Sequence, residues 1–314
     1  MREVDELIAL IPPELRPPGE RPRLDCNATT ANGVVHQIDL YVPEVPDAAS
    51  RDAIAAILNH PRALEVRRLG VSRSCEEWPR PTDLDFGWVL DALAEVGRPA
   101  RLEWLFVHEP AKTTMDPIAR FATKPRALVT YNKLTRFVSG TFTGVELLDL
   151  RDTDVEWSCG ADAFPDLTTL IVRPRGPKKI GAQWASSLFA RPEVLPRLRE
   201  LRAPEERGDE VVDLLLASPL LAQLRCLDFT NALTDRGAAA LYEDAAKLDH
   251  VEQLWVATTI ERRHQWAALA RQAGARATLP LLGELEITDA WRHRLRERFG
   301  RRVRFDVRPR HPNL

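Results

Sequence analysis

Residues 224–238 read Leu224-Arg225-Cys226-Leu227-Asp228-Phe229-Thr230-Asn231-Ala232-Leu233-Thr234-Asp235-Arg236-Gly237-Ala238. The segment opens with three apolar residues spaced φ-x-x-φ-x-φ, where φ is an apolar side chain. Because side chains alternate along a strand, Leu227 and Phe229 share one face. A helical pattern follows over 235–246. The segment therefore predicts one short strand followed by one helix.

The same apolar spacing recurs along the chain. Its middle residue falls at Ile38, Leu69, Leu105, Leu148, Leu170, Leu201, Leu227, Leu254 and Leu285. Helical patterns lie between most of these positions, at Ser50–Asn59, Asp83–Val96, Asp116–Ala122, Gly181–Ala190, Asp209–Ser218, Asp235–Ala246 and Thr259–Ala273. Strands that alternate with helices predict β-α units and a parallel sheet.

Residues 224–238 resemble the leucine-rich repeat family in its long, ribonuclease-inhibitor-like form, as found in bacteria. The family's usual segment is L-x-x-L-D-L-S-x-N-x-L-x-D-x-G-A, and here Asn231 stands one place early. The resemblance implies an α/β solenoid, with a curved parallel β-sheet on the concave face and helices on the convex face. Most other units lack the asparagine, so we expect irregular repeats.

The resemblance divides the chain into three parts. Residues 1–30 form an N-terminal cap with a Pro-rich arm, 31–288 the solenoid, and 289–314 an Arg-rich C-terminal cap. The 43-residue gap between Leu105 and Leu148 leaves two readings open. It holds either a degenerate repeat around Leu128–Phe137 or an insertion near 108–144.

A doubly wound α/β domain is the rival fold, since it also alternates strands and helices. Two features favour the solenoid. No Gly-rich phosphate loop follows the first expected strand, and the units repeat one hydrophobic template, which doubly wound domains do not do.

Composition excludes several classes of protein. The chain has 314 residues, 44% of them hydrophobic, with a net charge of −2. No apolar run approaches the roughly 18–20 residues of a membrane span. Four cysteines without CxxC spacing favour neither a zinc site nor a disulfide scaffold. The N-terminus has no signal-peptide pattern, so we expect a cytoplasmic protein without a membrane partner.

Motifs of catalysis are missing from the sequence. It contains no GxxxxGK[ST], HExxH, GxSxG or GxGxxG. Asp149, Asp152 and Asp154 are interpreted as solvated turn residues, and the basic run 173–181 as an exposed loop. We therefore expect no enzymatic activity, no cofactor and no metal.

Side chains flanking the core positions of each strand are expected on the concave face. Those best suited to binding are Trp104, Phe106, His108, Arg151, Arg173, Arg202 and Trp255. Tryptophan and arginine dominate interaction hot spots. Two alternatives stay open. The N-terminal arm or the 110–140 segment covers Trp104 and Phe106, and the arginines pair with Asp149 and Glu200.

The sequence therefore predicts a non-catalytic protein-interaction module, such as an adaptor, a sensor or an inhibitor subunit. The alternative is binding of nucleic acid or an acidic partner through the Arg-rich C-terminal helix and the 173–179 loop. The near-neutral net charge argues against nucleic acid as the main partner. The identity of the partner and the oligomeric state stay open.

Overall fold

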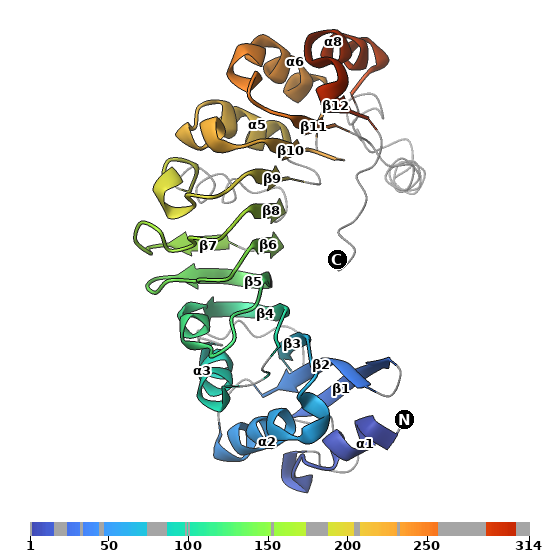
Figure 1. Ribbon diagram of the computed structural model, residues 1–314, viewed down its shortest axis with the longest axis vertical. Coiled ribbons are helices and arrows are strands. Elements are labelled where there is room, and N and C mark those ends of the chain that lie inside the picture. The colour runs from blue at the N-terminus through green and yellow to red at the C-terminus, as the bar shows by residue number, and fades with distance from the viewer. Residues whose placement is uncertain are drawn as a thin grey trace, which may run out of the picture. The chain divides into compact units, whose positions relative to one another are not determined.

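The chain is a mixed α/β protein with a large, mostly parallel β-sheet (Figure 1). A computed structural model describes residues 2–15, 24–31, 34–43, 47–73, 87–97, 99, 101–151, 154–173, 188–203, 208–230, 233–256 and 287–305. They fall into two compact units. Unit 1 is Met1–Leu167 with Pro174–Pro177 and Glu193–Pro196, and unit 2 is Thr168–Arg173, Lys178–Pro192 and Arg197–Leu314.

Unit 1 holds most of the longer strands. Its α-helices are α1 (Arg2–Ile8), α2 (Ala48–Asn59) and α3 (Gly87–Val96). Its 3-10 helices, labelled η, are η1 (Pro13–Leu15), η2 (Pro61–Ala63) and η3 (Asp116–Arg120). Its strands are β1 (Asp25–Ala31), β2 (Val34–Val42), β3 (Arg68–Arg73), β4 (Trp104–Thr114), β5 (Ala127–Phe137), β6 (Leu147–Arg151) and β7 (Asp154–Trp157).

Unit 2 combines short strands with helices. The α-helices are α5 (Gly208–Leu216), α6 (Asp235–Glu243) and α8 (Asp289–Phe299). The 3-10 helices are η5 (Pro219–Gln223), η6 (Ala245–Leu248) and η9 (Gly300–Arg302), while η4 (Pro192–Val194) lies where the chain passes between the units. The strands are β8 (Thr169–Arg173), β9 (Glu200–Arg202), β10 (Cys226–Asp228), β11 (Gln253–Trp255) and β12 (Val303–Arg304).

In unit 1, β2 to β6 are parallel and lie in chain order. The residues predicted as strand centres lie side by side, Ile38 opposite Leu69 and Leu69 opposite Leu105. Leu105 faces Leu128, which faces Leu148. The gap between Leu105 and Leu148 thus contains the full strand β5, in register with its neighbours.

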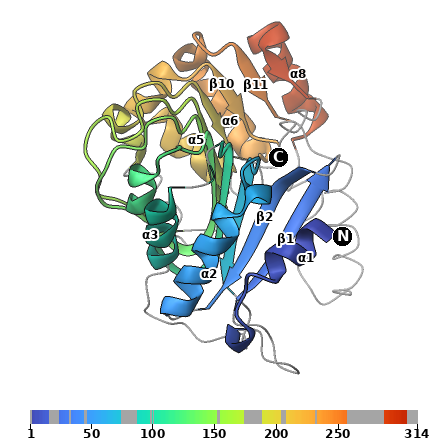
Figure 2. The ribbon, with the colours of Figure 1, turned by 60° about the horizontal axis from the view of Figure 1, so that its bottom comes forward.

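Unit 1 begins with a hairpin that the sequence analysis did not predict. β1 runs antiparallel to β2, whereas 1–30 was expected to be only a cap and a Pro-rich arm. Helix α1 packs against β1 (Figure 2). Because Leu7 and Leu24 are fully buried there, this end of the unit is covered by its own chain.

In unit 2, β8 to β12 are parallel. Leu170, Leu201, Leu227 and Leu254 again lie in one register. The next residue in that row is Val303 of β12. The unit expected around Leu285 lies outside the described residues, as do all of 257–286.

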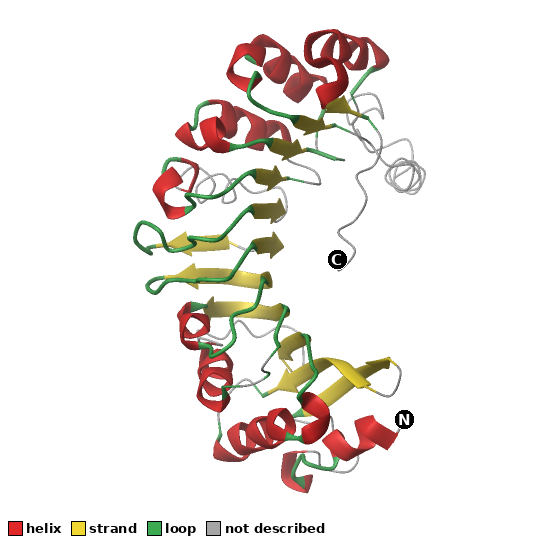
Figure 3. Cartoon of the chain, in the orientation of Figure 1, coloured by secondary structure: helices red, strands yellow, loops and turns green. Residues whose placement is uncertain are grey.

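The predicted core is confirmed. Every apolar template position of the units centred from Ile38 to Leu254 is at most 3% exposed. Helices α2 and α3 contact each other in unit 1, as do α5 and α6, and α6 and α8, in unit 2 (Figure 3). Within the described part of the chain, none of the helices has the length and hydropathy of a membrane span.

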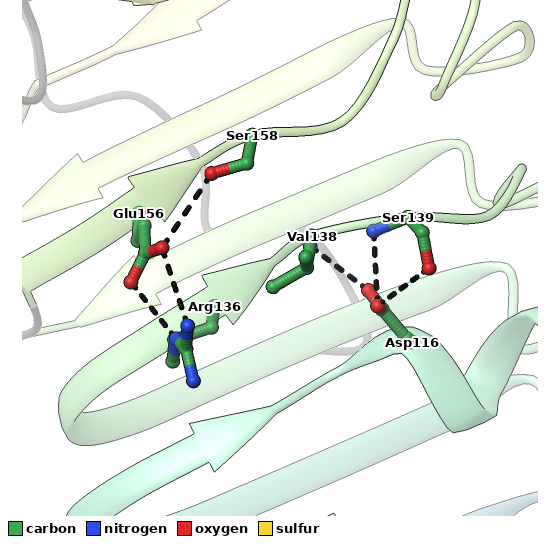
Figure 4. Close-up of polar contacts among 6 residues, drawn as sticks. All are labelled: Asp116, Arg136, Val138, Ser139, Glu156 and Ser158. Atoms are coloured by element: carbon green, nitrogen blue, oxygen red, sulfur yellow. Dashed lines mark hydrogen bonds and ion pairs between the residues drawn. The ribbon is translucent and has the colours of Figure 1, made fainter.

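The segment Asp116–Ala122 contains a shorter helix than predicted. It was expected to be helical, and it forms the short 3-10 helix η3 with Met115 at the cap position. The Asp116 carboxylate accepts hydrogen bonds from the next turn of chain. Its donors are the backbone N–H of Val138 at 3.0 Å and the backbone N–H and hydroxyl of Ser139, both at 2.9 Å (Figure 4).

An aromatic cluster in unit 1 lies at the C-terminal ends of β5 and β7. The Phe137 ring lies 5.4 Å from Phe142, 5.1 Å from Phe164 and 4.8 Å from Trp157, between ring centroids. Phe142 stacks on Phe164 at 4.6 Å. The three phenylalanines are fully buried, so they form a core where this part of the chain has no α-helix.

Candidate functional site

The site lies on the β-face of unit 1, which we define as the sheet face opposite Ile38, Leu69, Leu105, Leu128 and Leu148. Strand register places its residues in three rows. They are Gln37–Arg68–Trp104–Ala127–Leu147, Asp39–Gly70–Phe106–Val129–Asp149 and Tyr41–Ser72–His108–Tyr131–Arg151. The rows follow from the two-residue alternation of a strand. β5 contributes a column of three residues that the sequence analysis left out.

A hollow of about 410 Å³ opens on this face between β4 and β5. Its lining consists of Phe106, Val107, His108, Val129 and Tyr131. The His108 and Tyr131 rings meet edge to face, with centroids 4.7 Å apart. Tyr131 is 40% exposed, which places a large amphipathic ring at the mouth of the hollow.

The hollow is electrically neutral at neutral pH. The walls of the hollow partly desolvate the His108 ring and so lower its pKa below the ordinary value, because desolvation penalises the imidazolium form. The other four lining residues are apolar or phenolic. The pocket is therefore suited to an apolar or aromatic group that makes few hydrogen bonds.

The predicted exposure of Trp104 is wrong, since its side chain is only 4% exposed. The Arg68 guanidinium carbon lies 5.7 Å from the Trp104 ring centroid, and Phe106 stacks on the ring at 5.9 Å. A long arginine stem covers apolar surface while its charge stays near water, which explains the burial. Phe106 is partly exposed and His108 is exposed, so these two remain accessible.

Asp149 also differs from its interpretation as a solvated turn residue. It is fully buried, next to Val129 in the middle row of the β-face. The reason is that β6 continues to Arg151, which places Asp149 inside a strand. The side chains of Arg151, Asp152 and Asp154 lie outside the described set.

The predicted residues of unit 2 are less accessible than expected. Arg202 forms an ion pair with Glu200, and both side chains are largely buried. This is the ion-pair alternative that the sequence left open. Trp255 is partly exposed, and its indole N–H donates to Gln253 Oε1 at 3.4 Å. The side chain of Arg173 lies outside the described residues.

A second hollow in unit 1, of about 610 Å³, lies beside α3 and η3. Its charged groups are already engaged. Arg120 pairs with Asp91, and the Asp116 carboxylate holds the backbone at 138–139. Nearby, Arg136 of β5 makes a two-pronged contact with Glu156 of β7 (Figure 4). These contacts connect successive turns of chain, so we assign them to stability.

Tyr131 and Val129 were not predicted as site residues, because their repeat departs from the apolar template. By analogy with Leu102-x-x-Leu105-x-Val107, the template at β5 reads Pro125-x-x-Leu128-x-Thr130. Proline and threonine occupy two of its three apolar positions, although both are buried. The sequence signal that could have predicted them is the alternation of Ala127, Val129 and Tyr131 around Leu128, which is typical of a strand.

No three histidine, cysteine, aspartate or glutamate side chains gather as metal ligands within the described part of the chain. No protein-family model matches the chain, and no curated protein matches it in sequence. Among solved structures, a crystal structure of a Bacteroides fragilis protein is similar over 74% of this chain and 68% of its own, with 17% identity and a TM-score of 0.45. A likeness at this level assigns neither a family nor a function.

Proposed function

We propose that the chain is a non-catalytic protein-interaction module that binds a protein partner through the β-face of unit 1. The aromatic hollow at Phe106, His108 and Tyr131 is the observation that carries the proposal. In this role the hollow receives an apolar or aromatic side chain of the partner. The cellular role is that of an adaptor, a sensor or an inhibitor subunit.

The proposal includes a leucine-rich repeat solenoid of the long, ribonuclease-inhibitor-like type. Support comes from the common register of the strand centres within each unit and from the segment 224–238. A stack of such units fixes its strands before a partner arrives. Side chains on fixed strands lose little freedom on binding, which favours a preformed docking surface.

The lining of the hollow favours binding over catalysis. Its five residues include one imidazole and one phenol, with no carboxylate, thiol or amine among them. Nucleophilic or general acid–base catalysis needs a group to react and another to activate or orient it. A tyrosine at the rim of an apolar pocket is instead typical of interaction hot spots.

Site-specific photocrosslinking tests this proposal. A photoreactive phenylalanine analogue replaces Tyr131 in the native host, and the crosslinked protein is identified and purified. We then expect Tyr131→Ala to weaken binding of that protein about 30-fold, which corresponds to the roughly 2 kcal/mol of a hot-spot residue.

Tyr242 is the matched control, because it is 38% exposed and lies on helix α6 of unit 2. The same analogue at Tyr242 should not crosslink the partner, and Tyr242→Ala should leave its affinity unchanged. Crosslinking from position 242 but not from 131 would reject the β-face as the docking surface.

A further inference from the structure

A carboxylate stands beside the aromatic hollow on the β-face of unit 1. Asp39 of β2, Gly70 of β3 and Phe106 of β4 are register neighbours in the middle row of that face. A Cβ added to Gly70 would lie 2.1 Å from Asp39 Oδ1, so the carboxylate occupies the space above β3 that a larger residue would fill. It therefore lies one strand away from Phe106, on the same face as the hollow.

The Asp39 carboxylate is accessible to a partner. The residue is partly exposed, and its Oδ2 accepts a hydrogen bond from Gln37 Nε2 at 2.8 Å, which holds the group in place. Within the described part of the chain, no arginine, lysine or histidine forms an ion pair with Asp39. Arg68, the register neighbour of Gln37, has its guanidinium over the Trp104 ring. The negative charge of Asp39 is thus available for a cation from outside.

The other carboxylates of this face are less suited to such a contact. Asp149 lies next to Val129 in the same row, but it is fully buried and a partner cannot reach it. Asp25 of β1 lies in another row and is separated from the hollow by β2 and β3. Among the described carboxylates of the face, Asp39 is therefore the accessible one beside the hollow.

The distance from this carboxylate to the hollow matches two residues of an extended chain. The hollow opens between β4 and β5, about one and a half strand spacings from β3, which is about 7 Å at about 4.8 Å per strand. An extended segment advances about 3.3 Å per residue, and its side chains two positions apart point the same way. A segment that crosses the strands therefore reaches both places with alternate side chains.

We propose that the partner presents an extended basic–aromatic segment, with an aromatic side chain in the hollow and a lysine or arginine two positions away at Asp39. The partner is the one of the proposed function, on which this inference rests. A cation gives the carboxylate charge-assisted hydrogen bonds, and an aromatic ring fills the hollow. An acidic segment would place like charges together, and a wholly apolar one would desolvate Asp39 without pairing it.

Selection from a phage library of random nine-residue peptides on the full-length protein tests the proposal. The wild type should enrich an aromatic residue with lysine or arginine two positions away, in either chain direction. Asp39→Asn should keep the aromatic residue and lose the basic one. Asp39→Arg should select an acidic residue at the same spacing, because the charge at this place is reversed.

The most enriched peptide then gives the size of the contact in fluorescence anisotropy. Replacing its basic residue with a neutral analogue, citrulline or acetyl-lysine, should weaken binding to the wild type about two- to fivefold, as expected for an exposed ion pair. The same replacement should not change binding to Asp39→Asn, so the double-mutant cycle isolates the pair. Raising the salt concentration from about 50 mM to about 1 M should remove most of the difference, because the charges are then screened.

Glu95→Gln is the matched control variant. Glu95 also belongs to unit 1, and its side chain is 66% exposed on helix α3, where it pairs with Arg51. The variant changes the net charge of the chain by the same amount as Asp39→Asn. It should leave both the enriched pattern and the affinity unchanged. Circular dichroism of every variant checks that the fold is intact.

The outcomes separate this inference from the proposed function. Enriched aromatic residues without a basic neighbour would overturn the inference and leave the hollow as the docking site. Loss of the basic residue in Glu95→Gln as well would also overturn it, because net charge and not the place of Asp39 would then be selected. The absence of enriched peptides, or peptides whose binding survives Tyr131→Ala, would reject both. A dimer of the full-length protein that dissociates on Tyr131→Ala would make a second copy the occupant and likewise overturn the inference.

Discussion

The chain returns from one strand to the next in two different ways, through extended segments between β4 and β6 of unit 1 and through α-helices in unit 2. In unit 1, Leu105, Leu128 and Leu148 are 23 and 20 residues apart, and the chain between them uses the 11-residue strands β4 and β5 and the five-residue η3. In unit 2, Leu201, Leu227 and Leu254 are 26 and 27 residues apart. There the strands have three residues and the helices α5 and α6 have nine.

The rise per residue explains the difference. A nine-residue α-helix spans about 13 Å, at about 1.5 Å per residue. Four extended residues span about the same distance, at about 3.3 Å per residue. A repeat that is about five residues shorter can therefore span the same distance if the segment between its strands is extended and not helical. Strand β7, paired with the second half of β5, is such a return.

The largest effect is expected in the aromatic cluster, which replaces helix packing in the short units. Phe164→Ala removes a fully buried ring that contacts Phe137, Phe142 and Trp157. We expect the free energy of unfolding to fall by about 3–5 kcal/mol, the usual cost of deleting a buried phenylalanine. Denaturant titration measures it. A loss below about 1 kcal/mol would show that the cluster is not a tightly packed core.

A smaller effect is expected where the helices of unit 2 approach each other. A Cβ at Gly237 would lie 2.2 Å from Asp209 Oδ1 and 2.8 Å from Leu233 Cδ2. Gly237→Ala should therefore cost about 2–3 kcal/mol, since the overpacked contact must shift apart. Gly160→Ala is the control, because no heavy atom lies within 4 Å of its added Cβ. Equal denaturation midpoints for the two variants would contradict this account.

Asp209 supplies the link between the same helices. Its carboxylate accepts the Thr234 N–H at 2.9 Å and the Thr234 hydroxyl at 2.5 Å. Asp209→Ala should cost about 1.5–2 kcal/mol, as expected for hydrogen bonds to a charged group. In unit 1, Asp47 is the N-cap of α2 and accepts the Ser50 N–H at 2.6 Å, so Asp47→Ala should cost less, about 1 kcal/mol. Thermal unfolding of both variants ranks them, and the reverse order would refute the comparison.

Much of the fold could be predicted from the sequence, because the apolar template directly marks burial. Leu69, Leu201 and Leu227 each stand at the centre of the same φ-x-x-φ-x-φ pattern. This pattern alone identifies a strand that buries one face. The hairpin of β1 escaped prediction because Asp25–Ala31 is rich in polar and small residues. β5 was expected only as one of two alternatives, a degenerate repeat around Leu128–Phe137, because Pro125 and Thr130 occupy template positions.

The site could be predicted only in part. Strand alternation placed Phe106 and His108 on the β-face, but it could not predict the side-chain contacts between neighbouring strands. Trp104 was expected to be exposed, but it is buried, and the guanidinium over its ring comes from Arg68, 36 positions earlier in the sequence. Contacts across strands follow from register and rotamers, which a single sequence does not contain.

The smallest expected effect concerns His108 of unit 1. Among the described residues, the strands of unit 2 contain no histidine. The pKa of His108 is lowered by burial, so the unfolded chain binds a proton more readily than the folded one. This cost is absent above the unfolded pKa of about 6.5 and grows as the pH falls from there toward the folded value. We expect the melting temperature of the wild type to drop more than that of His108→Gln between pH 8 and pH 5. An equal fall in melting temperature for the two proteins would show that the hollow does not desolvate the ring. An NMR titration that gives His108 a pKa above about 6.5 would show the same.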